Sequence, residues 1–142
     1  MPITSSTPNN LFIEGPVMNV IVLPSAPVIQ DLRNKNQNIP QYNLAGLIDT
    51  GCSNTCINGR IAQEMGLVPN EERVVYTPSG KSTQLMYDVT LFFQTTGNIP
   101  FPLQVCGANL EGQPYQALIG RDFLALGIFI YNGPSHRWDL CV

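Results

Sequence analysis

The sequence predicts an all-β domain with one or two short helices. Apolar and polar residues alternate over 85–93 and again over 99–105, as expected for strands with one buried face. Clusters of Pro, Gly, Asn and Ser separate the apolar runs and mark turns. The chain has 142 residues, which is enough for one hydrophobic core and too short for two ordinary domains.

The amino-acid composition argues against some classes of binding partner. Hydrophobic residues make up 44% and charged residues 12% of the chain, so we expect a partner to cover part of the surface. The net charge is −3 and no basic run is present, which argues against nucleic acid as a ligand. No apolar run approaches the roughly 18 to 20 residues of a membrane span, and the start lacks the features of a signal peptide. We therefore expect a cytoplasmic protein with no membrane partner.

The first half of the chain predicts two strands and one helix. Residues 1–14 are expected to be a flexible segment, since the first ten are rich in Pro, Ser, Thr and Asn. A β-branched apolar run predicts a strand over 16–23, and a second strand is expected over 44–48. Between them, 24–43 holds three prolines, four asparagines and three glutamines, and is interpreted as a long loop. Helical spacing follows over 57–65, with Gly66 at the position of a C-terminal cap.

The second half predicts antiparallel sheet. A hairpin is expected over 73–93, with its turn at Thr77-Pro78-Ser79-Gly80. After a turn at 96–98, prolines at 100 and 102 favour an edge position for the next strand. The remaining elements are expected in the order strand, helix, strand, turn and strand, over 115–119, 121–126, 128–131, 132–134 and 137–142.

One tripeptide contains the candidate catalytic residue. Asp49-Thr50-Gly51 follows an apolar strand, so the carboxylate emerges at a strand end and Gly51 permits a sharp turn. Peptide hydrolysis by carboxylates requires one ionised group to accept a proton from water and one protonated group to polarise the carbonyl. Two carboxyls within about 3 Å share a proton in this way. Because the chain contains this tripeptide once, a symmetric homodimer is the economical source of the second carboxyl.

Two motifs together resemble the retropepsin family of aspartic proteases. The first, from residue 47, is Leu-Ile-Asp-Thr-Gly-Cys-Ser-Asn-Thr; the second, from residue 117 about 70 residues later, is Ala-Leu-Ile-Gly-Arg-Asp-Phe-Leu. The resemblance covers 15–142 and implies an acid-protease fold, a closed barrel that functions as a homodimer, with terminal strands such as 137–142 joining those of the partner. It also implies an aspartic endopeptidase that cleaves peptide or protein substrates and needs no metal or organic cofactor.

The resemblance also implies roles for individual residues. Thr50 would hydrogen-bond across the dimer axis, or would serve as a local turn hydroxyl. Ser53 and Asn54 would bind the substrate backbone, or would cap a helix. The hairpin turn would be a flap over the substrate, or an ordinary surface hairpin; its residues are Tyr76, Thr77, Pro78, Ser79 and Gly80. This turn departs from the family pattern, whose flap tip is rich in glycine.

The second motif has a structural role in the family. It comprises Leu118, Ile119, Gly120 and Arg121. Arg121 would brace the base of the dimer through a buried ion pair or hydrogen bonds, or would be a free arginine at a helix terminus.

Two rival functions remain open from the sequence. The first is a catalytically silent dimerisation or peptide-binding module with the same fold. The second is a thiol enzyme or redox module that uses Cys52 and Cys56, although packing is the expected role of all four cysteines. His136 is the only histidine, and with no second cysteine pair we expect no metal site.

Overall fold

The computed structural model describes residues 2–6, 10–93 and 99–142, and the fold is mostly β. The strands are β1 (Pro2–Ser6), β2 (Val17–Pro24), β3 (Tyr42–Ile48), β4 (Cys56–Asn58), β5 (Glu71–Thr77), β6 (Gly80–Phe93), β7 (Phe101–Ala108), β8 (Ala117–Ile119), β9 (Ile128–Asn132) and β10 (Arg137–Cys141). The helices are α1 (Leu11–Glu14), α2 (Ala26–Asn34), α3 (Gly59–Glu64) and α4 (Arg121–Leu124).

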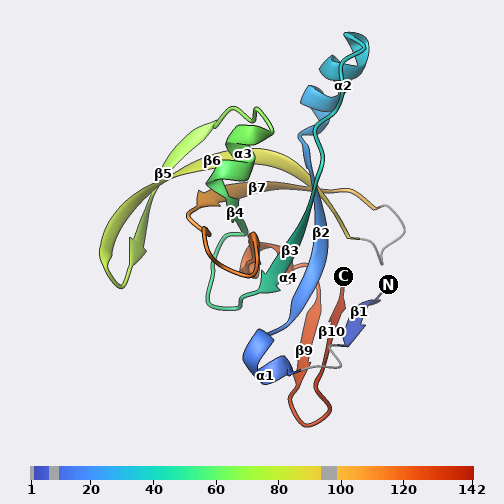
Figure 1. Ribbon diagram of the computed structural model, residues 1–142, viewed down its shortest axis with the longest axis vertical. Helices are drawn as coiled ribbons and strands as arrows, with labels where there is room; N and C mark the ends of the chain where they lie inside the picture. Colours follow the sequence, from blue (N-terminus) through green and yellow to red (C-terminus); the bar gives the residue numbers. More distant parts are fainter. Residues whose placement is uncertain (1, 7–9, 94–98) are drawn as a thin grey trace.

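The strands form two sheets (Figure 1). The larger has the order β2-β3-β8-β4-β7-β6-β5, and β6 also pairs with β2. The pairings therefore return to their starting strand, and six strands form a ring in which each is hydrogen-bonded to two others. The pairs β3–β8 and β4–β7 are parallel, and the other pairs are antiparallel. The smaller sheet, β1-β10-β9, is antiparallel throughout.

One main core fills the interior of this arrangement. Alternate residues of β2 and β3 point inward, as the period of two predicts, whereas β6 is also buried in succession over 86–87 and 89–91. Three aromatic rings pack together, with centroids 4.7 to 5.6 Å apart, and join β6, β7 and α4; they are Phe93, Phe101 and Phe123. This contact fixes α4, which follows the second motif, against the sheet that carries the first.

Most predicted strands and both predicted helices are confirmed. The first two strands, the hairpin β5–β6 and the strands near the C-terminus all appear within a few residues of the predicted bounds. Thr77 pairs with Gly80, so Pro78 and Ser79 form a two-residue turn. Helix α3 ends before Gly66, whose φ of +71° is typical of a C-terminal cap. The predicted turn at 96–98 lies outside the described residues.

The prediction of a long loop over 24–43 is wrong, because α2 occupies Ala26–Asn34. Ser25 precedes the helix and Pro27 lies in its first turn, where the missing N–H of proline costs nothing. The helix buries no side chain and stands away from the body of the molecule (Figure 1). The prolines and asparagines in and around it suggested a loop.

Two other differences arise from contacts between distant segments. Within the segment predicted to be flexible, β1 pairs with β10, and α1 buries Leu11. β7 lies between β6 and β4, so it is an edge strand only over its first half, where Pro102 lies. In this chain β10 is the central strand of its sheet, with β1 and β9 on its two edges, and the expectation that terminal strands such as 137–142 join those of a partner stays a prediction.

None of the four helices in the described part of the chain is long and apolar enough to cross a membrane.

Candidate active site

Asp49 lies at the carboxyl end of β3, where the chain leaves the sheet. Its N–H donates to the carbonyl of Ile119 at 2.9 Å and so extends the parallel pairing of β3 with β8 by one bond. The side chain is partly exposed, whereas Ile48 just before it is buried. The sheet therefore fixes the backbone of Asp49 and leaves its carboxylate open to solvent.

The turn after Asp49 is closed by the aspartate itself. The N–H of Gly51 donates to Asp49 Oδ1 at 2.9 Å, and the N–H of Cys52 donates to the carbonyl of Asp49 at 3.2 Å. Gly51 does not have a positive φ, so the sharp turn does not depend on glycine's conformational freedom as the sequence suggested. Glycine fits here because a Cβ would lie 3.1 Å from Asp49 Oδ1, in tight contact with the carboxylate.

The second motif packs directly against this turn. The N–H of Arg121 donates to the carbonyl of Cys52 at 2.8 Å, and the N–H of Asp122 donates to that of Ser53 at 3.2 Å. Gly120 is required by close approach, since a Cβ there would lie 2.7 Å from the backbone carbon of Asn54. The two motifs that the sequence separates thus form one unit, which we call the Asp49 loop (residues 49–55) and its brace (residues 120–122).

A hydrogen-bonded pair at the centre of this unit was missed by sequence reasoning. The Thr55 hydroxyl donates to Asp122 Oδ1 at 2.7 Å and accepts from the N–H of Gly120 at 3.0 Å. The N–H of Thr55 also donates to the Asp122 carboxylate at 2.9 Å, and Thr55 is fully buried. Both residues lie inside the two motifs, which was the only signal in the sequence that could have identified them.

Arg121 contributes a further bond to the Asp49 loop. One guanidinium nitrogen donates to the carbonyl of Thr50 at 2.7 Å, although the side chain is exposed. The arginine is therefore not free. It takes part in none of the ion pairs found among the described residues, so the hydrogen-bonded alternative is the one that this chain adopts.

Comparisons with known proteins were made at three levels. Neither a protein-family model nor a curated protein matches the chain. A solved structure does. It is the solution structure of the simian foamy virus (mac) protease, which is 14% identical and has a TM-score of 0.49. The match covers 78% of this chain and 92% of that one.

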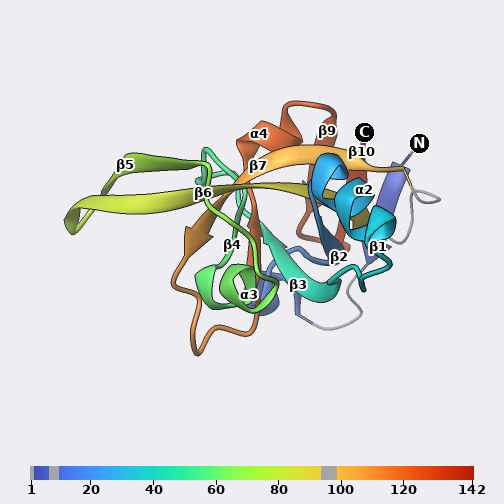
Figure 2. The same ribbon diagram turned by 90° about the horizontal axis from the view of Figure 1, so that it is seen from above.

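The residues expected to bind substrate are not gathered in one place in the single chain. Ser53 and Asn54 belong to the Asp49 loop, and the alternative that they cap a helix is wrong, because Asn58 caps α3 by accepting from the N–H of Arg60. The hairpin β5–β6 reaches out from the body as an arm in both views (Figures 1 and 2). Near its tip the amino group of Lys81 lies 5.5 Å from the ring centre of Tyr76. Pro78, Ser79 and Gly80 are exposed, and the backbone of Thr77 ends β5.

Three cysteines lie in or beside the Asp49 loop. The sulfurs of Cys52 and Cys56 are 3.8 Å apart, and Cys106 is the register partner of Cys56 on β7. The hydrogen bond from Cys56 lowers the pKa of Cys52 to about 7, against the opposing effects of burial and the Asp49 carboxylate. The same contact and the one with Cys106 raise the pKa of Cys56. Cys52 is therefore the most reactive thiol of the cluster.

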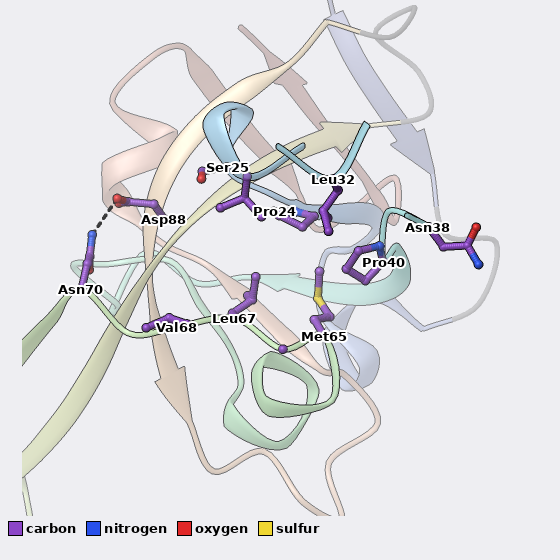
Figure 3. Close-up of a pocket in the computed structure, with 12 residues that line it drawn as sticks. Pro24, Ser25, Leu32, Asn38, Pro40, Met65, Leu67, Val68, Asn70 and Asp88 are labelled. Atoms are coloured by element: carbon purple, nitrogen blue, oxygen red, sulfur yellow. Dashed lines mark hydrogen bonds between the residues drawn. The ribbon is translucent and has the colours of Figure 1, made fainter. Parts of the chain in front are cut away.

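A separate groove of about 590 Å³ lies at the base of α2 (Figure 3). Apolar side chains from α2, β2 and the segments before β3 and after α3 face one another across it, and include Pro24, Leu32, Pro40, Met65 and Leu67. Asn70 donates to Asp88 at 2.6 Å at one end. No residue of the Asp49 loop lines the groove, so it is distinct from the candidate active site.

Within the described ranges, no group of three or more His, Cys, Asp or Glu side chains is arranged to hold a metal ion.

Proposed function

We propose that this protein is an aspartic endopeptidase of the retropepsin type, in which Asp49 of two identical chains activates water between them. The observation that carries the proposal is the state of Asp49: a partly exposed carboxylate at a strand end, in a loop that distant backbone donors hold in one geometry. Catalytic carboxylates require this combination of access and fixed position.

The proposed reaction uses one shared proton. Two Asp49 carboxyls that face each other within about 3 Å cannot both ionise, so one remains protonated. The ionised carboxylate accepts a proton from water, the water attacks the scissile carbonyl, and the protonated carboxyl stabilises the developing oxyanion. The tetrahedral intermediate then collapses as a proton passes to the leaving amine. Thr50, next to Asp49, is the residue proposed to hydrogen-bond across the axis and hold the two carboxyls coplanar.

The fold proposed is the closed barrel of the acid proteases. The ring of six paired strands supports it, because a sheet that returns to its first strand leaves no open edge between those six. The brace at 120–122 supports it as well, since it carries the second motif to the loop that carries the first.

An exposed apolar surface supports the proposed homodimer. Ile128 and Ile130 of β9 and Phe12 and Ile13 of α1 are all at least half exposed, and Ile128 is 66% exposed. The two elements lie side by side (Figure 1). The Tyr131 hydroxyl, on the face of β9 opposite to Ile128 and Ile130, donates to the carbonyl of Leu11 in α1 at 3.4 Å. Apolar patches of this kind mark sites of association. We propose that a second copy of this chain covers it.

The hairpin β5–β6 and the Asp49 loop are proposed to bind the substrate. Ser53 and Asn54 would hold the peptide backbone, and the hairpin tip over 76–80 would close on it as a flap. Few charges are available in the chain, so we propose extended peptides with apolar side chains beside the cleaved bond as substrates.

The decisive experiment is the substitution Asp49→Asn. The two side chains have nearly the same shape, so the variant should fold while peptide cleavage falls to background. Asp31→Asn is the matched control, because Asp31 is an exposed carboxylate that pairs with Lys35 on α2. Cleavage that persists unchanged in purified Asp49→Asn excludes the carboxyl pair as the catalyst. A folded wild-type dimer that cleaves no peptide would instead support a catalytically silent module.

A further inference from the structure

The positions of the sulfur atoms at the Asp49 loop distinguish the pair Cys52 and Cys56 from the other cysteines. Cys52 and Cys56 both donate to the carbonyl of Asn54, at 2.8 and 3.3 Å, and their sulfurs are 3.8 Å apart. Cys141 lies in β10 of the other sheet. A shared acceptor between two thiols holds both sulfurs on the same side of the loop, at about van der Waals contact.

We propose that Cys52 and Cys56 form a reversible disulfide that inactivates the Asp49 loop. The oxidant is a low-molecular-weight disulfide. The Cys52 thiolate attacks one of its sulfurs and releases one thiol, which leaves a mixed disulfide on Cys52. The Cys56 thiolate then attacks the Cys52 sulfur and releases the second thiol. The two cysteine protons end on the two released thiols, so one disulfide is reduced as another forms.

The exposure of the thiols determines that Cys52 reacts first with the external disulfide. Cys52 is partly exposed, whereas Cys56 and Cys106 are 6% and 2% exposed. The Cys106 thiol donates to the side-chain oxygen of Gln84, which lies on β6. Of these three cysteines an external disulfide therefore reaches only Cys52, and Cys56 is the thiol best placed to resolve the adduct. Once Cys52 is in a mixed disulfide it no longer carries a thiolate charge, so one of the causes that raise the pKa of Cys56 is removed.

Closing the bond requires the loop to move. A disulfide has a sulfur–sulfur distance of about 2.0 Å, so the two atoms must approach by about 1.8 Å. Cys56 is fixed in β4, which pairs with β7 on one side and β8 on the other. Cys52 must therefore supply most of the movement. Its N–H bonds to the carbonyl of Asp49, and its carbonyl accepts from Arg121 of the brace.

The consequence for activity rests on the proposed function. A shift of about 1 Å in a catalytic group can reduce the rate about 100-fold. We therefore expect the oxidised protein to lose at least about tenfold of its peptidase activity, and to recover it when dithiothreitol reduces the bond.

Peptide mapping tests the disulfide itself. The reduced full-length chain is incubated with oxidised glutathione, free thiols are blocked with iodoacetamide, and the protein is digested with trypsin. Cleavage after Lys35 and Arg60 places Cys52 and Cys56 together on peptide 36–60, while Cys106 lies on 82–121 and Cys141 on 138–142. The expected result is peptide 36–60 lighter than its dithiol form by two hydrogen atoms and carrying no alkyl group. A cross-link to peptide 82–121, glutathione retained on Cys52, or four alkylated cysteines would each overturn the proposal.

A second experiment compares the peptidase activity of the oxidised protein with that of the reduced protein for each variant. The ratio of oxidised to reduced activity should fall in wild type and in Cys141→Ser, and should stay near one in Cys52→Ser, which lacks the thiol that begins the exchange. Oxidised wild-type protein that carries the disulfide and retains full activity contradicts the proposal that the disulfide inactivates the Asp49 loop. Mapping does not depend on cleavage, so a reduced protein that cleaves nothing contradicts the proposed function while the mapping still decides on the disulfide.

Discussion

The hydroxyl of Thr55 lies 2.7 Å from a carboxylate oxygen of Asp122, which is 67 residues further along the chain. This contact joins the loop that carries Asp49 to the segment that begins α4. The same hydroxyl accepts from the N–H of Gly120, so one buried oxygen connects the two motifs twice. The geometry of Asp49 is therefore determined as much by the second half of the chain as by β3.

Thr55→Val tests this connection. Valine has nearly the same volume but lacks the hydroxyl, so the N–H of Gly120 loses its partner in a buried site. Leaving such a group unpaired costs about 1 to 3 kcal/mol. We expect the free energy of unfolding in urea to fall by that amount, and peptidase activity to fall with it. Thr83→Val is the control, since Thr83 is exposed on β6 and should change stability by less than about 0.5 kcal/mol. Equal stability of the two variants would contradict the role of Thr55.

Gly120→Ala tests the close packing of the brace. The added methyl would lie 2.7 Å from a backbone carbon and 2.8 Å from the carbonyl oxygen of Asn54, and backbone cannot move aside cheaply. We expect a loss of about 1 to 3 kcal/mol in the free energy of unfolding, measured by thermal denaturation. Gly133→Ala is the control. The nearest atom to a Cβ added at Gly133 is a Tyr131 ring carbon at 3.7 Å, so this variant should leave the midpoint of thermal denaturation nearly unchanged. A similar midpoint for both variants would show that the loop and the brace separate easily.

Ile128→Asp tests the surface proposed to bind a second copy. A charge at this 66% exposed position should prevent association without disturbing the core. Sedimentation velocity should show wild type at twice the mass of one chain and the variant at the mass of one chain, with cleavage lost in parallel. Val68→Asp is the control, because Val68 is 82% exposed and lies beside the groove at the base of α2. A wild-type chain that sediments as a monomer at the concentration used for cleavage contradicts the shared site.

The rate of alkylation tests the environment of Cys52. Only the thiolate reacts with iodoacetamide, and the hydrogen bond from Cys56 lowers the pKa of Cys52 to about 7. The rate should therefore rise with pH up to about pH 7 and change little above pH 8, measured by the mass of peptide 36–60. Cys56→Ala removes the donor, so in this variant the rate should keep rising toward pH 9. Identical pH profiles for the two proteins would refute the effect of Cys56.

The sequence predicted the elements whose signals are local. Apolar runs marked β2 and β3, alternation marked the hairpin, and Gly66 marked the end of α3. Elements that depend on distant partners were missed, namely β1 and the three-residue strand β4, because their order comes from pairing with β10, β7 and β8. The same division holds at the candidate site. Asp49 was identified from its tripeptide, whereas Thr55 and Asp122 acquire their importance only when the two motifs meet.

Helix α2 lies outside the ring of paired strands and contributes no side chain to the core. A tag or fluorescent label inserted between Arg33 and Lys35 would therefore lie away from the strand pairings of that ring. Such a label gives an experimenter a way to immobilise or follow the protein while its aspartate, its cysteines and its apolar surface all remain native.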